Sequence, residues 1–367
     1  MAIVRFINVS KYYGEVVAVE NLNLEIRDKE FFCLLGPSGC GKSSTLRMIA
    51  GLETVTSGEI YIGDTLVNDL EPRERNIAMA FENYALYPHL TVFENIAFPL
   101  RVQKVPEETK KRKVEEVAKI LDINELLDRR VDQLSGGQQQ RVSTGRAIVR
   151  NPQVFLLDEP ISHLDAKLRD HMRGELKRLQ RKLQVTTTYV THDQIEAMSM
   201  ADRIAVMDLG VIQQVGTPWE IFNKPANTFV ANFVGSPRIN SFDCSLKEEK
   251  GRYSLATNSF EYNLSLKAGK LIAEKAPFPD TLQFGIRPRN IGVHLEDEKI
   301  ENVIPVEVSI TEPLGDYTIV DLILGDDILK AIVPPDLKLE ENQRLTVTFP
   351  EQHIHVFDAK TGVRIEM

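Results

Sequence analysis

The residues best suited to chemistry lie near the N-terminus and match the G-x-x-x-x-G-K-[ST] phosphate-binding pattern. They are Gly36-Pro37-Ser38-Gly39-Cys40-Gly41-Lys42-Ser43. Glycines allow successive backbone N–H groups to point at one centre, Lys42 can reach the β- and γ-phosphates of a nucleotide, and the Ser43 hydroxyl suits Mg²⁺. An apolar run precedes the loop and a helical pattern follows it, which is the context that the motif needs. A glycine-rich turn without a ligand is therefore the weaker interpretation.

Further polar residues directly follow two other predicted strands. Asp158 and Glu159 follow the run 154–157, and His192 follows the β-branched run 186–191. Open α/β sheets bind ligands at the carboxyl ends of parallel strands, so we expect all three side chains at that edge of the sheet. Buried acids without a metal ion or a base would be costly. A histidine is more often a surface residue, but the position of His192 after a core strand favours a functional role.

A second glycine turn, Ser135-Gly136-Gly137-Gln138, stands before a polar and basic helical pattern. A serine and two glycines at a helix start can bind an anion, although Ser-Gly-Gly alone is a common loop sequence. Tyr13 lies upstream of the phosphate loop. Its ring either stacks on an adenine or shields the end of a strand, and the spacing leaves both interpretations open.

The elements that must position these residues predict an α/β domain followed by a smaller β domain. A length of 367 residues suggests two or three domains. The clearest boundary is Gly235-Ser236-Pro237. Beyond it apolar residues alternate in short segments divided by Gly-Asp and Pro-Pro turns, which predicts a small β-barrel. This second part shows no catalytic constellation in its sequence.

Composition narrows the class of protein further. A net charge of −9 and a pI near 5.5 argue against a general nucleic-acid binder. The three cysteines share no close spacing, which indicates reduced thiols in a cytosol. We find no signal peptide and no apolar run long enough to cross a bilayer, so we expect any membrane role to come through a partner protein. The apolar, aromatic segment Ala85–His89 either packs in a core or accepts a partner's helix.

Taken together and in this order, the phosphate loop, the turn 134–138, the acids 158–159 and His192 resemble the nucleotide-binding domain of ATP-binding-cassette (ABC) ATPases. This resemblance covers about residues 3–235. Other segments are similar to the maltose-type branch of carbohydrate importers and extend the match to nearly the full chain. These segments are Ala85–His89, Asp165–Arg169, Thr191–Gln194 and Phe284–Pro288.

The resemblance implies a fold class and a domain organisation. Residues 1–235 would form an α/β P-loop nucleotide-binding domain, with a helical subdomain at about residues 85–150. Residues 236–367 would form a small all-β domain of the oligonucleotide-binding (OB) type, which regulates uptake and helps dimerisation in that family. The family also implies a head-to-tail homodimer with ATP and Mg²⁺ bound at the interface.

The same resemblance implies roles for the residues of one subunit. Tyr13 stacks on the adenine, and the segment from Ser38 to Ser44, including Lys42, holds the phosphates. Ser43 binds Mg²⁺, and Asp158 supports this ion through water. Together these residues would orient the γ-phosphate for attack by water, because its charge must be met from several sides.

The remaining roles concern hydrolysis and the opposite subunit. Glu159 would be the general base for the attacking water, and His192 would contact the γ-phosphate. The segment Ser135–Gln138 of the opposite subunit would complete the phosphate site, while Asp165 passes signals between the two sites. Glu82 stands where the family normally has a glutamine that contacts metal and water, so we expect Glu82 near Mg²⁺.

We therefore expect an ATPase subunit of a sugar importer on the cytoplasmic face of the cell membrane. Transmembrane permease subunits would dock near Ala85–His89, and a solute-binding protein would act indirectly. An importer of polyamines, metal ions or glycerol phosphate would share this architecture. A soluble non-transport ABC ATPase is the alternative from another class, but it would more often show two cassettes, a coiled-coil insertion or basic surfaces.

Overall fold

The computed structural model shows two compact units, residues 1–218 and 219–367. It describes residues 2–80, 84–162, 164–276, 281–295 and 303–367. Each unit has its own sheets and its own hydrophobic core.

The first unit is built around a mainly parallel sheet. Within the described residues its strand order is β10-β9-β3-β8-β7-β6, and only the pair β9–β10 is antiparallel. Every residue of β3, β7 and β8 is buried, as expected for strands covered on both faces. The strands are β3 (Phe31–Leu35), β6 (Ile77–Ala80), β7 (Val154–Asp158), β8 (Thr186–Thr191), β9 (Arg203–Asp208) and β10 (Val211–Gly216).

An antiparallel sheet of order β2-β1-β4-β5 completes the strands of this unit. Its apolar residues share one core with the parallel sheet and with the helix after the phosphate loop: Val4, Phe6 and Leu24 belong to the same cluster as Leu34 and Leu46. The phosphate loop is thus held between two packed layers. The strands are β1 (Val4–Tyr13), β2 (Val16–Ile26), β4 (Ser57–Ile62) and β5 (Thr65–Leu66).

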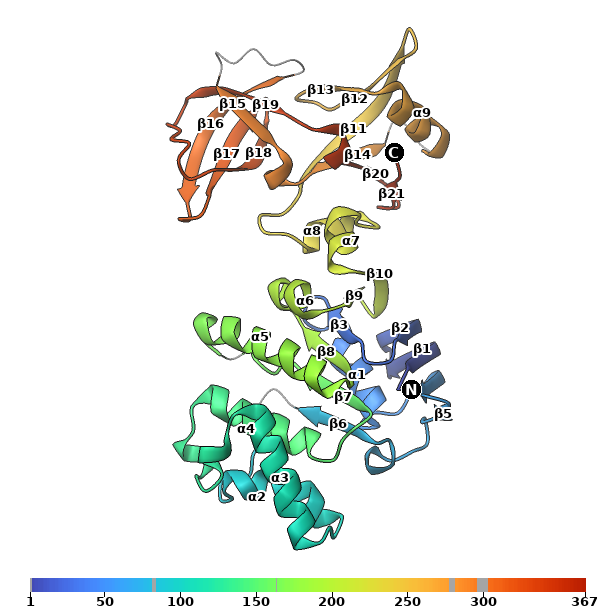
Figure 1. The fold of residues 1–367 in the computed structure, drawn as a ribbon. Coiled ribbons are helices and arrows are strands. Elements are labelled where there is room, and N and C mark those ends of the chain that lie inside the picture. The colour runs from blue at the N-terminus through green and yellow to red at the C-terminus, as the bar shows by residue number, and fades with distance from the viewer. Residues whose placement is uncertain (1, 81–83, 163, 277–280, 296–302) are drawn as a thin grey trace. The chain divides into compact units, whose positions relative to one another are not determined.

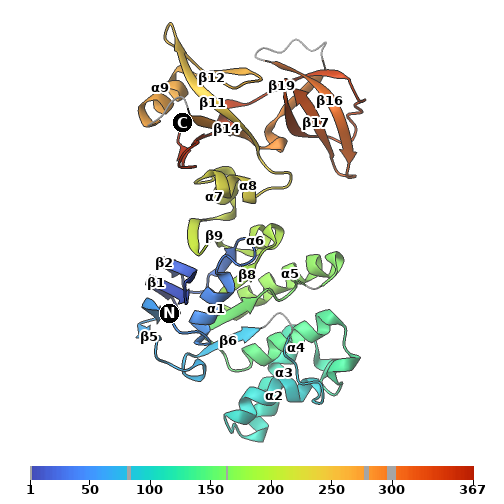
Figure 2. The same cartoon turned by 180° about the vertical axis from the view of Figure 1, so that it is seen from behind.

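Helices α2, α3 and α4 pack on one another and form a helical group (Figure 1), and α4 contacts β6 of the parallel sheet. Helix α1 contacts β7 and β8, and α6 contacts β3 and β8, so both flank this sheet (Figure 2). Among the described residues, no helix combines the length and the apolar character needed to span a bilayer. The helices are α1 (Lys42–Ala50), α2 (Val92–Val102), α3 (Glu107–Leu121), α4 (Gly136–Ile148), α5 (Ala166–Leu183) and α6 (Gln194–Met200).

The second unit is dominated by antiparallel strands. Its described strands form two sheets, β13-β12-β11-β14-β20-β21 and β15-β19-β16-β17-β18, which share one apolar core. The strands are β11 (Asn240–Glu249), β12 (Arg252–Ala256), β13 (Glu261–Leu264), β14 (Leu282–Ile286), β15 (Gly292–Leu295), β16 (Ile304–Pro313), β17 (Thr318–Leu324), β18 (Asp327–Val333), β19 (Arg344–Thr348), β20 (Ile354–Asp358) and β21 (Arg364–Ile365). The helices are α7 (Pro218–Asn223), α8 (Thr228–Phe233) and α9 (Leu266–Lys275).

Helices α7 and α8 group with the second unit, although they precede the boundary expected at Gly235-Ser236-Pro237. A buried arginine gives the physical reason. The Arg287 guanidinium donates to the carbonyl oxygens of Phe222 (2.9 Å) and Val234 (2.6 Å), and it lies 3.9 Å from the centre of the Phe222 ring. Burial lowers the pKa of Arg287 to about 10. These contacts fasten the two short helices to the end of β14.

Candidate nucleotide site

Steric demands explain the glycines of the phosphate loop between β3 and α1. Gly39 and Gly41 adopt φ angles of +82° and +102°, which L side chains rarely tolerate. A Cβ atom on Gly41 would lie 2.2 Å from the Ala18 carbonyl oxygen, and one on Gly36 would lie 2.3 Å from that of Met207. Any larger residue at these two positions would push the loop away from the strands behind it.

Lys42 occupies the centre of this loop. Its side chain is buried (4% exposed), and Nζ donates to the carbonyl oxygens of Gly36 (2.9 Å) and Pro37 (2.8 Å). Burial raises the pKa of the neighbouring Cys40 thiol, while the charge of Lys42 acts to lower it. The loop therefore presents a fixed cation beside a helix N-terminus, an arrangement suited to phosphate.

Asp158 is brought against the phosphate loop at the end of β7. Its Oδ1 atom accepts a hydrogen bond of 3.1 Å from the Ser43 hydroxyl. Asp158 is almost completely buried, so its carboxylate needs positive charge or hydrogen bonds nearby. A hydroxyl and a carboxylate side by side are the hard oxygen donors that Mg²⁺ prefers. These two side chains therefore fit a magnesium ion.

Glu159 and His192 form a second pair at the same sheet edge. Glu159 has a φ angle of +44°, and its backbone N–H donates to the Val190 carbonyl oxygen of β8 (3.1 Å). Its Oε2 atom lies 2.9 Å from Nδ1 of His192. The left-handed turn thus directs the Glu159 carboxylate toward the residue that follows β8. A carboxylate beside an imidazole can accept a proton from water and remain oriented.

Tyr13 presents an exposed ring at the end of β1. The residue is 45% exposed, so shielding of a core edge does not account for its position. Its hydroxyl donates to Glu53 and lies 3.4 Å from the Ser44 hydroxyl. Nζ of Lys11 lies 4.8 Å from the ring centre. These three contacts hold the exposed ring next to the phosphate loop.

The turn Ser135–Gln138 forms a separate cluster at the start of α4. Ser135 is the N-cap: its hydroxyl accepts from the Gln138 N–H, and the Gln138 side chain accepts from the Ser135 N–H. A Cβ atom on Gly136 would lie 3.1 Å from the Leu164 side chain, and one on Gly137 would lie 3.3 Å from that of Leu168. The two glycines therefore let α4 approach the segment that leads into α5.

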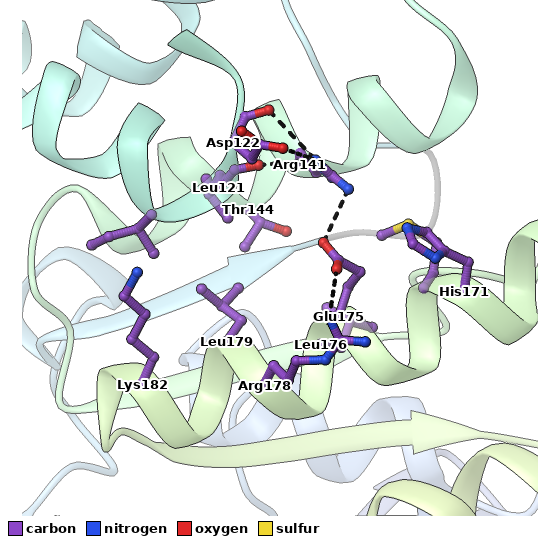
Figure 3. Close-up of a pocket in the computed structure, with 12 residues that line it drawn as sticks. Leu121, Asp122, Arg141, Thr144, His171, Glu175, Leu176, Arg178, Leu179 and Lys182 are labelled. Atoms are coloured by element: carbon purple, nitrogen blue, oxygen red, sulfur yellow. Dashed lines mark hydrogen bonds and ion pairs between the residues drawn. The ribbon is translucent and has the colours of Figure 1, made fainter.

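Asp165 begins α5, where its carboxylate caps the helix by accepting from the Leu168 N–H (3.0 Å). An ion pair between Arg141 of α4 and Glu175 of α5 (3.0 Å) joins the two helices further along, as Figure 3 shows. Arg141 also donates to the Leu121 carbonyl oxygen at the end of α3 (3.1 Å). The Arg141 contacts border a pocket of about 500 Å³. They join α4, which begins after Ser135, to α5, which begins after Asp165.

The segment before the apolar stretch 85–89 is fastened to α4. The Ser143 hydroxyl and the Arg146 guanidinium both donate to the Tyr84 carbonyl oxygen (3.0 and 2.9 Å), and Arg146 also donates to that of Ala85 (2.6 Å). Burial raises the pKa of Tyr84 to about 12. The position expected for Glu82 lies outside the described residues.

The structure thus brings the expected residues together in two clusters. Lys42, Ser43, Asp158, Glu159 and His192 meet at the carboxyl ends of the parallel strands, linked by the contacts between Ser43 and Asp158 and between Glu159 and His192. The Ser135 turn instead packs toward α5 of its own chain.

Sequence reasoning assigned no role to two residues beside these clusters: Arg141, which joins α4 to α5, and Glu196, which accepts hydrogen bonds from two hydroxyls of β8. Arg141 was visible only as one of several basic residues after the glycine turn. Glu196 had one weak signal, its position three residues after the helix cap Asp193.

A P-loop strand–loop–helix unit, paired acids at the sheet edge and a capped glycine turn define an ABC-type ATPase cassette. Comparison with known families agrees, since residues 19–162 match the ABC transporter family and residues 284–357 match the TOBE domain. The trehalose/maltose import ATP-binding protein MalK of Thermococcus litoralis is 49% identical over 100% of both chains. The xylose/arabinose import ATP-binding protein XacJ of Haloferax volcanii is 46% identical over 100% of this chain and 96% of its own.

Solved structures show the same cassette. The dimeric structure of MJ0796, described as a bacterial ABC transporter cassette, is 34% identical with a TM-score of 0.52, and it covers 59% of this chain and 98% of that chain. A post-hydrolysis dimer of the same cassette with ADP and Pi gives a TM-score of 0.51 at 34% identity and the same coverage. This chain belongs to the ABC transporter family. It is an ATP-hydrolysing subunit of the importer type, with a P-loop α/β domain and a C-terminal all-β TOBE region, as the sequence indicated.

Proposed function

We propose that this chain hydrolyses ATP to drive the import of a sugar. The support comes from relatives whose names specify trehalose/maltose, xylose/arabinose and, in Bacillus subtilis, oligosaccharides, the last at 45% identity over 100% of both chains. Import of glycerol phosphate is a second candidate, because a glycerol-3-phosphate import protein of Ralstonia nicotianae is 45% identical over 98% of this chain and 97% of its own.

One observation carries the catalytic proposal: the Glu159–His192 pair (2.9 Å) stands at the same sheet edge as the Ser43–Asp158 pair (3.1 Å). In this arrangement Lys42 and the loop amides bind the β- and γ-phosphates. Glu159 accepts the proton of the attacking water as the bond between the γ-phosphorus and the ADP oxygen breaks. His192 orients Glu159 and contacts the γ-phosphate. The negative charge on the transferred phosphoryl group is stabilised by groups that are already positioned around it.

Nucleotide and metal would be held by the side chains around this edge. The Tyr13 ring stacks on the adenine, and the hydroxyls of Ser38 and Ser44 line the phosphates. Ser43 would bind Mg²⁺ and Asp158 would support this ion through water, and the ion would neutralise charge on the phosphates. A placement of Glu82 near this ion remains our expectation.

A homodimer would complete each site. We infer that Ser135 to Gln138 of one subunit close over the γ-phosphate bound by the other, with the N-terminus of α4 supplying oriented N–H groups. Asp165 would link this contact to the opposite site. The reported dimeric cassettes support dimer formation in the family. Closure of the dimer would then accompany ATP binding, and opening would follow hydrolysis.

Membrane subunits would dock at a groove beside the stretch Ala85–His89. This groove has a volume of about 830 Å³, and it is lined by apolar side chains of α2, by Tyr87 and by Arg73, Arg146 and Arg150, together with one acidic residue, Glu74. An apolar helix that carries an acidic residue fits this lining. Such docking would hold the chain at the cytoplasmic face of the membrane. A solute-binding protein would act through the membrane subunits.

We further propose that the all-β part, expected from residue 236 onward, regulates the cassette domain expected over residues 1–235. This domain resembles OB-type regulatory domains and contributes to dimer persistence. The transport chemistry does not require it, because all candidate catalytic residues precede position 193.

The test of the catalytic proposal is Glu159→Gln, which keeps the side-chain shape and removes the base. ATP hydrolysis by the full chain should fall by about two to four orders of magnitude. ATP binding should persist, so that an ATP-bound dimer accumulates and can be measured by light scattering. Glu15→Gln, in the exposed turn between β1 and β2, is the matched control and should hydrolyse ATP normally. Near-normal turnover by Glu159→Gln would remove Glu159 from the role of base.

A further inference from the structure

We propose that Glu196 is a positioning residue that fixes His192 for ATP hydrolysis. Glu196 lies in the first turn of α6 and is only 2% exposed. Its Oε2 atom accepts two hydrogen bonds, from the hydroxyls of Tyr189 (2.8 Å) and Thr191 (2.7 Å). Both donors belong to β8, the strand that delivers His192. A single buried carboxylate therefore connects α6 to the last residues of this strand.

The Thr191 hydroxyl extends this connection across the histidine. It donates to Glu196 and also accepts from the Asp193 N–H (2.9 Å), so the residues on either side of His192 share one hydroxyl group. Asp193 in turn caps α6 by accepting from the Ile195 N–H (2.7 Å). The backbone of His192 is thus held from both sides while its ring remains free to meet Glu159.

A contact with α5 fastens the same turn from outside. The Arg169 guanidinium lies 3.5 Å from Oδ2 of Asp193. Arg169 stands one helical turn after Asp165, the residue that begins α5. The His192 turn is therefore anchored to the sheet through Glu196 and to α5 through Arg169. Movement of α5 would reach the histidine through this ion pair.

The hydrogen-bond pattern also shows which property of Glu196 matters. Burial raises the pKa of Glu196, and the hydroxyls of Thr191 and Tyr189 act to lower it. Both hydroxyls donate to one oxygen, so the required property is an acceptor at that point. A glutamine carbonyl can serve as this acceptor, whereas alanine leaves two buried hydroxyls without it. Glu196→Gln is therefore the conservative variant.

This inference rests on the proposed role of His192 at the γ-phosphate. Glu196→Ala in the full chain should lower kcat for ATP about ten- to a hundredfold, because a buried acceptor for two donors is lost. KM and the binding of a non-hydrolysable ATP analogue should stay within about twofold of wild type. Glu196→Gln should restore most of the rate. Ile195→Ala, an exposed neighbour on the same helical turn, is the matched control and should behave as wild type.

A double-mutant cycle separates positioning from general support of the fold. In a His192→Ala background, adding Glu196→Ala should cause no further loss of kcat, because the positioned group is already absent. If Glu196→Ala does not fold, Thr191→Val takes its place, since it removes the bridging hydroxyl and keeps a strand-forming side chain. Both variants should give the same pattern.

Three results would overturn the inference. Normal kcat for Glu196→Ala and Thr191→Val would do so, and so would an equal loss of rate in the presence and absence of His192. Failure of Glu196→Gln to restore activity would be the third, because a hydrogen-bond acceptor at this point would then not be sufficient to position His192. A normal rate for His192→Ala would instead overturn the proposed role of His192 itself, and that result is distinguishable from the others.

Discussion

Two inactive variants test most directly whether each ATP site is composed of residues from both subunits, which we call the composite site. One variant alters the phosphate loop, and the other alters the Ser135 turn that would act on the opposite subunit. Lys42→Ala removes the buried ammonium that lies 2.8–2.9 Å from the loop carbonyls. Ser135→Asp places a negative charge where we expect the γ-phosphate, and it leaves α4 capped because aspartate is a good N-cap. Each homodimer then carries the same lesion in both sites. We expect each to hydrolyse ATP at a small fraction of the wild-type rate.

Mixing the two variants should restore activity by a predictable amount. If subunits exchange freely, about half of the dimers are heterodimers, and each contains one site with both lesions and one site with neither. About a quarter of all sites are then intact, so the rate of an equimolar mixture should approach about a quarter of wild type. Steady-state ATPase activity measured against the mixing ratio should pass through a maximum near equal amounts. ATP-dependent dimerisation should follow the same curve.

A neutral cap at the same position provides the control. Ser135→Asn preserves the helix cap and adds no charge, so we expect it to keep most of the activity alone. If Ser135→Asn is as inactive as Ser135→Asp, the damage comes from the α4 turn itself and not from repulsion of phosphate. If mixing never improves on either variant although heterodimers form, the head-to-tail composite site is refuted.

Three further predictions concern the second unit, its boundary and the groove. Burial lowers the pKa of His355 to about 3, below its unfolded value, so the folded second unit keeps this histidine neutral. The resulting contribution to the free energy of unfolding is fully present above pH 6.5 and is lost as pH falls toward 3. Between pH 7.5 and 5 the second unit should lose about 2 kcal/mol, visible as weaker hydrogen-exchange protection of β14 and β20. His355→Leu should abolish this acid dependence and His353→Gln should keep it; equal acid sensitivity of His355→Leu would contradict the prediction. A chain that ends at residue 218 should bind ATP and unfold cooperatively. A chain that ends at residue 236 keeps α7 and α8 but lacks Arg287, so it should aggregate more. Identical behaviour of the two truncated chains would place the boundary nearer residue 236. Val102→Glu, in the exposed wall of the groove, should reduce co-purification of the membrane subunits without changing the ATPase rate of the isolated chain, and unchanged co-purification would exclude docking there.

The local sequence was sufficient to predict the loop, the helix cap and the strands that hold the candidate site. The phosphate loop could be predicted because its demands are steric and short-range: Gly41 needs a left-handed φ angle and has no room for a Cβ atom. The cap at Ser135 likewise depends on residues within one helical turn. The acids after β7 and the histidine after β8 could be placed at one sheet edge, because a short apolar run and a short β-branched run both favour buried strands.

Only the tertiary structure decided how these elements meet. Ser43 and Asp158 are 115 positions apart and Glu159 and His192 are 33 apart, and the separation of partners in sequence does not specify which atoms face each other. The ion pair between Arg141 and Glu175 could not be predicted from the sequence either, because each residue alone looks like an ordinary charged position on a helix surface.

The boundary between the units shows this limit most clearly. The sequence by itself predicted a boundary at Gly235-Ser236-Pro237, since glycine, serine and proline together favour a loop between elements. The structure assigned α7 and α8 to the second unit, because Arg287 reaches back to carbonyl oxygens that precede this segment. The same holds for Glu196, whose role depends on two hydroxyls of a neighbouring strand. Hydrophobic periodicity and helix caps are determined by residues close together in the sequence. Buried polar contacts depend instead on where distant segments of the chain pack.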